Sequence, residues 1–429
     1  MRLLSWRLVW CLVLVPFLLF GGNAGALLQE DAAPAKLLAM ADELIPIVVR
    51  LRGLEPKEPI HKGVKSREEI SQFISKEADA QFEKGELKSE GLVLQKLGLI
   101  PADLDYVPFV IKLLSEQAGG YYDPATKSLY IASWLPADQQ RPAMIHELTH
   151  ALQDQYYDLD GMIKRDRKGR NDDKVLAHMA IAEGDATAVM LNYVLEPVGR
   201  SYTELPDIVF IMQAQLSLMN DQFEVLKGAP EYLKQNLVFP YSYGAAFMQK
   251  VRAHNEPWSV VDKIYSDLPS STEQIIHPDK YLGERDNPLA VEVADPTPQL
   301  GKEWKVVYSN VLGEFGLSLL LQLNLAEEVA KRAATGWGGD QLILVEDGSG
   351  HSAVFAETAW DTQESADRFF GALSTWLQHR YPKAKKSGES ESGFALVSDG
   401  EYHSIRRVGT RVRLIVGLPG SLGIKFGSR

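Results

Sequence analysis

The residues with the clearest chemical potential are His146 and His150, which lie in the sequence His-Glu-Leu-Thr-His with Glu147 between them. On an α-helix, side chains four positions apart lie above one another, so both imidazoles can reach one cation. Glu147 points about 100° away round the same helix, beside the cation without binding it. From there its carboxylate can accept a proton from a water molecule that the cation activates. This H-E-x-x-H pattern is typical of zinc sites with hydrolytic chemistry.

A helix must present these side chains. Pro142 suits a first helical turn, and Asp138 is placed to cap it. Apolar residues then recur at helical spacing, at Ile145, Leu148 and Leu152. The five-residue motif also arises by chance on ordinary amphipathic helices, but the surrounding pattern favours a metal site.

A catalytic zinc ion needs a third protein ligand and one position left for water. Glu183 is the candidate, because it is a carboxylate in an apolar stretch, where burial without a partner would be costly. The stretch predicts a helix that begins at Asn171 or Asp172, either of which can cap it. His178 is the rival ligand, but it points about 140° away from Glu183 on that helix. We therefore expect Glu183 to complete the site.

Three further residues are expected to have structural roles. A glycine inside a helix is unfavourable by up to about 1 kcal/mol relative to alanine, so Gly184 indicates that another element passes close by. We expect that element to be the helix with the two histidines. Asp185 lies about 200° from Glu183 and is expected to be a hydrogen-bond partner elsewhere. Asp154, one turn beyond His150, is in position to support the histidines.

The first 26 residues have the pattern of a secretory signal. Arg2 and Arg7 supply positive charge, residues 8–20 are apolar, and residues 23–26 end in a cleavage pattern. This apolar run is shorter than the roughly 20 residues that a membrane-spanning helix needs. We therefore expect an exported, cleaved, soluble protein of the periplasm or the extracellular space, with an uncleaved signal anchor as the alternative.

The composition limits the possible partners and the source of stability. Cys11 is the chain's one cysteine and lies in the leader, so the mature fold is expected to depend on core burial and metal rather than on disulfides. The formal net charge of −12 argues against nucleic acid or an anionic membrane as a partner. A length of 429 residues predicts two or three domains.

The region before the zinc motif divides into two parts. Residues 27–104 are predicted to be mostly helical, with a helix at 35–52 and a second helix opened by a capping box of Ser66 and Glu69. They carry no chemistry, and scaffold or lid are both possible roles. A helix at 107–116 and a β-hairpin at 119–131, around an Asp-Pro turn, are predicted next. Such a hairpin can supply an edge strand along which an extended peptide pairs.

The region after the zinc motif ends in a separate module. Residues 205–255 are predicted to form helices, and a capping box of Ser270 and Glu273 opens a short helix that His277 ends. Residues 284–303, rich in Pro, Asp and Glu, are predicted to be a linker. Residues 304–429 are then predicted to form an α+β module, with helices at 312–335 and 362–380, a polar loop at 383–392, and strands at 342–346, 353–359, 394–398, 402–406 and 412–416.

The zinc motif followed by Glu183-Gly184-x-Ala186 resembles the gluzincin clan of zinc metallopeptidases, to which thermolysin-like proteases and M1 aminopeptidases belong. Residues 240–245, Pro-Tyr-Ser-Tyr-Gly-Ala, are similar to the M1 stretch Tyr-x-x-Gly-Ala. The resemblance covers about residues 105–255. It implies a zincin-like fold with a mainly helical catalytic domain at 105–283 and a small hairpin or sheet before the zinc helix.

The resemblance also implies a set of roles. Zn²⁺ would be held by His146, His150 and Glu183, Glu147 would act as general base, and the hydroxyl of Tyr241 would stabilise the oxyanion. Two other residues are alternatives for the oxyanion: Tyr243, which is close in sequence, and His277, although a helix-end histidine bonded to a carbonyl is the simpler interpretation of the latter.

Two departures from the family pattern bear on the activity. The gap between His150 and Glu183 is longer than usual, and the charged insert 158–173 fills it. The Gly-x-Met-Glu-Asn motif, by which aminopeptidases hold a free amino terminus, is missing. The sequence therefore predicts an exported zinc metallopeptidase of α+β fold that cleaves peptide or protein substrates internally. The alternative is a non-catalytic, zincin-like binding or assembly protein of the cell envelope.

Overall fold

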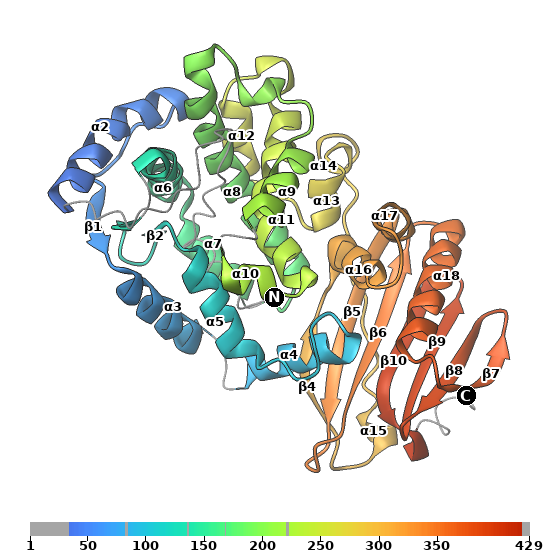
Figure 1. The fold of residues 1–429 in the computed structure, drawn as a ribbon. Coiled ribbons are helices and arrows are strands. Elements are labelled where there is room, and N and C mark those ends of the chain that lie inside the picture. Colours follow the sequence, from blue (N-terminus) through green and yellow to red (C-terminus); the bar gives the residue numbers. More distant parts are fainter. Residues whose placement is uncertain (1–33, 82–84, 135–136, 168, 220–222, 423–429) are drawn as a thin grey trace.

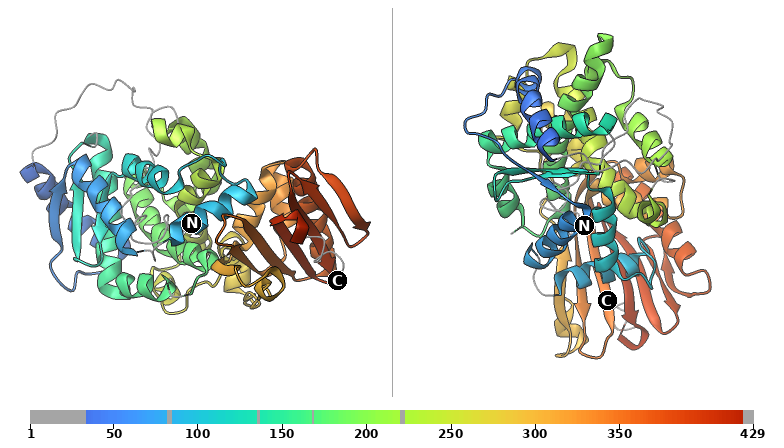
Figure 2. Two further views of the ribbon diagram at one scale, coloured as in Figure 1. Left: turned by 90° about the horizontal axis from the view of Figure 1, so that it is seen from below. Right: turned by 60° about the vertical axis from the view of Figure 1, so that its left-hand side comes forward.

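The computed structural model describes residues 34–81, 85–134, 137–167, 169–219 and 223–422. The predicted secretory leader, with Cys11, lies outside these residues. The chain has an α+β fold, in which a mainly helical part and a C-terminal sheet domain lie side by side along the length of the molecule (Figures 1 and 2). Across the described ranges, no helix is both long and apolar enough to cross a membrane.

The helical part is built from the first two thirds of the chain. Its early helices are α2 (Pro34–Arg52), α3 (Arg67–Gln81), α4 (Glu86–Leu97), α5 (Tyr106–Gln117), α6 (Ala137–Tyr157), α7 (Leu159–Arg167) and α8 (Asp172–Leu195). The later ones are η2 (Glu196–Val198), η3 (Tyr202–Glu204), α9 (Ile208–Met219), α10 (Glu224–Gly228), α11 (Glu231–Val251), η4 (Ala253–Asn255), α12 (Ser259–Ile264), α13 (Thr272–Ile276) and α14 (Asp279–Leu282). In Figure 1, α6 lies between α2, α8 and the small sheet, so the zinc motif is central to this part.

The helix signals in the sequence are mostly confirmed. The predicted helices at 35–52 and 107–116 are α2 and α5, each with one or two additional residues. The capping box before α3 is formed reciprocally, because Glu69 N donates to Ser66 Oγ (3.2 Å) and Ser66 N donates to Glu69 Oε2 (2.9 Å). These bonds hold the pKa of Glu69 at about 2. The cap predicted for the zinc helix is wrong, because α6 begins at Ala137 and Asp138 lies inside it.

A three-stranded sheet precedes the zinc helix. The predicted hairpin is β2 (Gly120–Asp123) and β3 (Ser128–Ala132), and β1 (His61–Lys65) adds in parallel to β3, which gives the order β1-β3-β2. The sequence did not predict β1, because its residues His-Lys-Gly-Val-Lys do not alternate between apolar and polar. Strand β2 is therefore a sheet edge, and it lies against α6.

The C-terminal domain is a seven-stranded antiparallel sheet in the order β4-β5-β6-β10-β9-β8-β7. Its strands are β4 (Lys305–Asn310), β5 (Trp337–Glu346), β6 (Ser352–Trp360), β7 (Lys385–Ser390), β8 (Gly393–Ser398), β9 (Glu401–Val408) and β10 (Arg411–Pro419). Alternate residues point to opposite faces. One face packs against α16 (Gly313–Gln322) and α18 (Gln363–Arg380), as predicted for helices on an antiparallel sheet.

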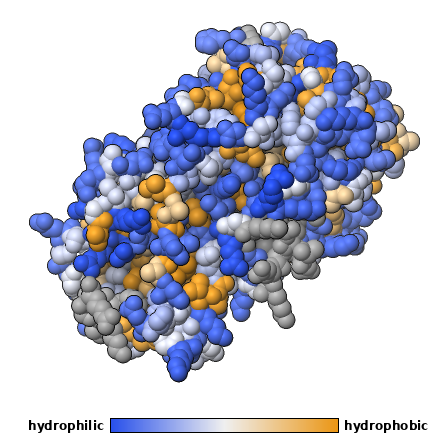
Figure 3. All heavy atoms as spheres, turned by 180° about the vertical axis from the view of Figure 1, so that it is seen from behind, coloured by the Kyte–Doolittle hydropathy of each residue, from blue (hydrophilic) through white to orange (hydrophobic). Residues whose placement is uncertain are grey.

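The other face of this sheet is only partly covered. Ile343 and Phe355 belong to a second apolar cluster, which Leu300 and Trp304 from the preceding segment complete. Seen from behind, the molecule is mostly hydrophilic, and hydrophobic side chains gather on its lower left part, over the C-terminal domain (Figure 3).

Three details of the C-terminal half correct the sequence predictions. The single helix expected at 312–335 is two helices, α16 and α17 (Glu327–Ala334), because Asn324 turns the chain and two acidic residues favour a new helix start at Glu327. The polar loop expected at 383–392 contains β7, a lysine-bearing edge strand that pairs with β8. The expected capping box at Ser270 is shifted by one residue, since Ser271 caps α13.

The predicted linker is ordered and packed. Leu289 N donates to Gly338 O (2.6 Å), and Val293 N donates to Gln341 Oε1 (2.7 Å), so the segment lies along β5. It ends in the short helix α15 (Thr297–Leu300). The helical part and the sheet domain are therefore joined by a fixed segment.

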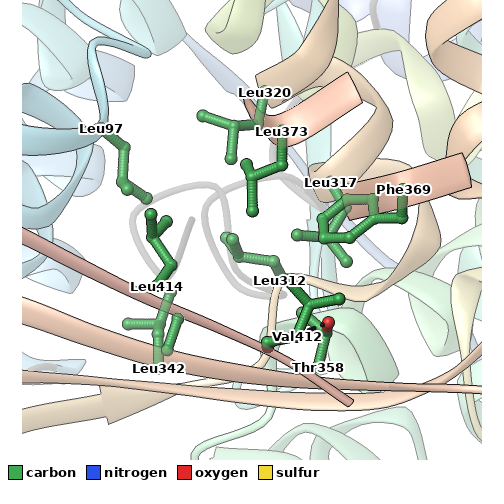
Figure 4. Close-up of a pocket in the computed structure, with 11 residues that line it drawn as sticks. Leu97, Leu312, Leu317, Leu320, Leu342, Thr358, Phe369, Leu373, Val412 and Leu414 are labelled. Carbon is green, nitrogen blue, oxygen red and sulfur yellow. Dashed lines mark hydrogen bonds between the residues drawn. The ribbon is translucent and has the colours of Figure 1, made fainter. Parts of the chain in front are cut away.

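Helix α4 also joins the two parts. Leu97, at its end, enters the space between the sheet and the helices α16 and α18 (Figure 4). A small cavity of about 20 Å³ remains there, and its other lining residues are Leu312, Leu317, Leu320, Leu342, Ala356, Thr358, Phe369, Leu373, Val412 and Leu414. The lining is almost entirely apolar, which is expected for a dry packing defect.

Buried carboxylates lie at the junction of the two parts. Asp173, in the first turn of α8, accepts hydrogen bonds from Thr272 N (3.1 Å) and from the hydroxyl of Thr272. Gly313 has φ +72° and presses so close that a Cβ there would lie 1.7 Å from Asp173 Oδ1. Asp340 accepts from Leu312 N and Gly313 N, both at 2.9 Å. Burial raises the pKa of Asp173 to about 7 and that of Asp340 to about 6.

These pKa values predict that the fold loses stability as the pH rises. A carboxyl whose pKa is higher in the folded chain than in the unfolded chain binds more protons when folded, so its contribution falls from about pH 4 upward to its folded pKa. We expect the melting temperature to decrease between pH 5 and pH 8, and Asp173→Asn to reduce this decrease. Thermal unfolding of both proteins across this range measures the difference. An identical pH dependence in the variant would contradict the prediction.

Candidate metal centre

Helices α6 and α8 bring three predicted ligands together. His146 Nε2 lies 3.0 Å from Glu183 Oε2 and 3.0 Å from His150 Nε2, and His150 Nε2 lies 3.3 Å from Glu183 Oε2. All three side chains are buried. His146, His150 and Glu183 form one of two groups in the described ranges whose geometry could hold a metal ion.

The donor atoms fit a tetrahedral zinc ion. With bonds of about 2.0 to 2.1 Å, the ligand atoms of such an ion lie about 3.3 Å apart. The three observed separations, 3.0 to 3.3 Å, are close to this value. Two imidazole nitrogens and one carboxylate oxygen are also a common ligand set of catalytic zinc, which keeps a fourth position for water.

The second group, Glu273, Asp286 and Asp361, already surrounds a cation of the chain itself. Lys280 Nζ donates to all three carboxylates, at 2.5, 2.7 and 3.2 Å respectively. We therefore consider it an ion-pair cluster.

The charge of Glu183 dominates the electrostatics of the triad. Burial opposes its ionisation, but His150 and the hydrogen bonds from both imidazoles outweigh that effect, so its pKa lies below the ordinary value. Burial would lower the pKa of His150, yet the carboxylate of Glu183 raises it to about 9. For His146, burial prevails and the pKa is lowered. The centre of the triad therefore attracts positive charge.

Glu147 lies on the same helix beside the triad. Its side chain is buried, which raises its pKa to about 8, although the nearby main-chain N–H of Tyr122 in β2 opposes this rise. Its Oε2 atom has no hydrogen-bond partner among the described residues. A buried carboxylate beside a main-chain donor, with one oxygen still available, is suited to take up a proton.

Gln153, and not Asp154 as expected, supports one of the candidate metal ligands. The Nδ1 of His150 donates to Gln153 Oε1 (2.8 Å), and Gln153 Nε2 donates to Ala182 O (3.1 Å). A proton on Nδ1 leaves Nε2 of His150 free to bind a cation, and the second bond ties α6 to α8. The prediction for Asp154 was wrong, because this carboxylate accepts from Tyr122, Lys127 and Leu159 instead.

Replacing Gln153 is expected to weaken metal binding. In Gln153→Met the side-chain volume is similar, but the bond that fixes the ring of His150 is lost, and we expect zinc affinity to decrease about 10- to 100-fold. Competition with a chromophoric chelator measures it. Gln155→Met is the matched control, since Gln155 bonds to the main chain of residues 57 and 58 and not to the triad. Equal affinities for the two variants would contradict this role.

Tyr241 packs against His146, one of the candidate metal ligands. It lies within α11, and its ring stacks on that of His146 with centroids 5.9 Å apart and an interplanar angle of 28°. Its side chain is 1% exposed. The structure thus brings Tyr241 to the predicted site.

The two alternatives for the oxyanion lie elsewhere. Tyr243 stacks on Phe239 (4.8 Å between centroids) and faces Phe315 of α16. The Nε2 of His277 lies 2.9 Å from Glu314 Oε1, so this histidine pairs with a carboxylate of the C-terminal domain. Neither contacts the triad through any interaction found in the described ranges.

A crossing of two glycines positions α8 and α11. A Cβ on Gly184 would lie 2.3 Å from the carbonyl carbon of Gly244, and one on Gly244 would lie 2.1 Å from Ala180 O. The close approach predicted from Gly184 is confirmed, but its partner is α11 and not the zinc helix. The crossing places the helix with Tyr241 directly on the helix with Glu183.

The remaining neighbours of Glu183 have structural partners. His178, the rival ligand, places Nδ1 2.7 Å from Asp166 of α7, so the charged insert supplies its partner. Asp185 accepts from Arg52 Nε (2.7 Å) and from the hydroxyl of Tyr265 (2.9 Å), as expected for a structural residue. Arg52 is fully buried at the end of α2. Helix α2 is therefore scaffold rather than a lid.

Comparison with known proteins concerns the C-terminal domain. A family model described as a domain of unknown function (DUF8575) matches residues 304–422, which is less than half of the chain. No curated protein and no solved structure gives a significant match. The candidate metal centre lies outside the matched residues.

Proposed function

We propose that this protein is an exported zinc metallopeptidase with a zincin-like catalytic domain, which hydrolyses peptide bonds inside its substrates. The observation that carries the proposal is the buried convergence of His146 Nε2, His150 Nε2 and Glu183 Oε2 beside Glu147. A purely structural zinc site is normally closed by four protein ligands, whereas three ligands leave a position for water.

The residues of the chain supply the remaining chemistry. A bound zinc ion provides Lewis acidity, which lowers the pKa of water and polarises a carbonyl group. Glu147 takes up the proton of the attacking water and returns it to the leaving amine when the carbon–nitrogen bond breaks. Its Oε2 atom, which has no hydrogen-bond partner in the described part of the chain, is the atom suited to this transfer.

Tyr241 is proposed to stabilise the negative charge that develops on the carbonyl oxygen. Its place against His146 supports this role, and a preorganised donor at such a position contributes about 3 to 4 kcal/mol of transition-state stabilisation. The burial of the triad keeps bulk water away and strengthens each of these electrostatic interactions.

Three features support the location and the type of cleavage. Residues 1–26 have the pattern of a secretory signal. The chain is acidic and its one cysteine lies within that segment, which fits an exported protein. The absence of the aminopeptidase motif from the sequence favours internal cleavage.

A peptide-library digest tests the proposal. Zinc-loaded mature protein is incubated with a mixture of unstructured peptides, with and without a chelator, and the products are identified by mass spectrometry. We expect internal cleavages that the chelator abolishes and that added zinc restores. Zinc binding without any cleavage would overturn the proposal and favour the non-catalytic envelope protein.

A further inference from the structure

The tyrosine of the edge strand contacts the zinc helix at two points. The main-chain N–H of Tyr122 lies near enough to the carboxylate of Glu147 to oppose the rise in its pKa, while the hydroxyl of Tyr122 donates to Asp154 Oδ2 at 2.8 Å. Glu147 and Asp154 are seven residues apart, which is about two helical turns, or about 10 Å, along the same face of α6. One residue of β2 therefore spans the face of the helix on which the proposed general base lies.

Asp154 is itself firmly held. Its side chain is fully buried, and it accepts from Lys127 Nζ (2.5 Å), from the hydroxyl of Tyr122 and from Leu159 N (2.9 Å). A buried carboxylate requires such donors, and here they fill both of its oxygens. Burial and the adjacent charge of Asp154 raise the pKa of Tyr122, so its hydroxyl stays protonated and remains a donor.

The turn between β2 and β3 also contacts Asp154, through Lys127. Lys127 adopts a positive φ of 52°, and Asp123 accepts from Ala125 N (3.0 Å) and from Thr126 Oγ1 (2.7 Å). This turn geometry directs Lys127 back to Asp154 on the zinc helix. The turn, the edge strand and α6 are thus joined through one carboxylate.

We propose that Tyr122 and Lys127, acting through Asp154, are positioning residues for Glu147. The inference rests on the proposed function. The hydroxyl of Tyr122 fixes the strand, and the strand delivers the main-chain N–H that lies beside the carboxylate of Glu147. When the hydroxyl bond is lost, the strand can shift relative to the helix, and a misplacement of about 1 Å is enough to reduce a rate about 100-fold.

The test uses Tyr122→Phe in the full mature protein, with Lys127→Met as a second variant. We expect kcat for a cleavable peptide to fall about 10- to 100-fold, while KM and zinc affinity stay within about twofold of the wild type. Tyr121→Phe is the matched control, because alternation places Tyr121 on the opposite face of β2, where it stacks on Phe73. It is expected to keep the wild-type kcat.

A second measurement does not require turnover. Hydrogen exchange, read by mass spectrometry on a peptide that covers β2, is expected to be faster in Tyr122→Phe and in Glu147→Ala than in Tyr121→Phe. Unchanged exchange and kcat in Tyr122→Phe would overturn the proposal, and so would a parallel loss of zinc affinity, which indicates general damage. A wild-type protein without hydrolysis would refute the proposed function, and the exchange result would still decide the positioning role.

Discussion

Glu147→Gln is expected to reduce peptide hydrolysis by about 10²- to 10⁴-fold, which is the usual contribution of a general base. The amide has the same shape, but it cannot take up a proton at neutral pH. Since Glu147 is not a ligand, zinc content should stay at the wild-type level. Initial rates with one defined peptide, together with metal analysis of the same samples, measure both effects.

A matched control separates this effect from simple destabilisation. Glu90 is another buried glutamate, in α4, and it accepts a hydrogen bond from the hydroxyl of Tyr106 (2.9 Å) far from the triad in sequence. Glu90→Gln should keep the wild-type rate. If Glu147→Gln keeps its zinc and also hydrolyses the peptide normally, Glu147 has no catalytic role.

Gly184→Ala is expected to lower both stability and zinc affinity. In most helices this change stabilises, because alanine is the better helix former by about 1 kcal/mol. Here the new methyl carbon would lie 2.3 Å from the carbonyl carbon of Gly244, so α8 and α11 must separate. Overpacking of this kind costs about 1 to 3 kcal/mol, occasionally more, and the separation displaces Glu183 or Tyr241.

Gly371→Ala provides the comparison for this prediction. Gly371 is also inside a helix, α18, but a Cβ there would meet nothing within 4 Å. We expect Gly371→Ala to be neutral or slightly stabilising and to leave zinc affinity unchanged. Denaturant unfolding and chelator competition compare the two variants. A gain of stability in Gly184→Ala would show that the glycine crossing does not constrain the metal centre.

The candidate metal centre could be recognised in the sequence because most of its geometry is local. Helical periodicity alone places His146 and His150 on one face with Glu147 beside them. Glu183 could be found as well, since it is a charged residue in an apolar stretch and such residues need a partner. The structure brings all four together, with Tyr241 against them. Their catalytic roles remain predictions.

The supporting residues were harder to predict because their partners are distant in sequence. Asp154 was assigned to the histidines on spacing, but its donors come from the hairpin and from the first residue of α7. Gln153 is three residues from His150, which is a helical contact distance, and an amide at that position was the available signal. The partner of Arg52 lies 133 residues away, and no local pattern indicates it.

In the fold, too, features with a local sequence pattern were predicted correctly, and features that depend on distant residues were not. The hairpin and the amphipathic helices were correct because each has its own period, while β1 and β7 were missed because sheet edges formed by polar residues have none. The assumed linker looked irregular from its composition. It is ordered by hydrogen bonds to β5, which only the folded sheet provides.

Metal stoichiometry tests the central claim most directly. The mature protein is purified without chelators and dialysed against a trace of zinc. Its zinc content is then measured by elemental mass spectrometry, together with that of His150→Ala and Glu183→Ala. If two imidazoles and one carboxylate bind a single ion, the wild-type protein should contain one zinc ion per chain. Each variant should then lose most of its bound zinc. A wild-type protein that binds no zinc, or variants that retain it fully, would contradict the account.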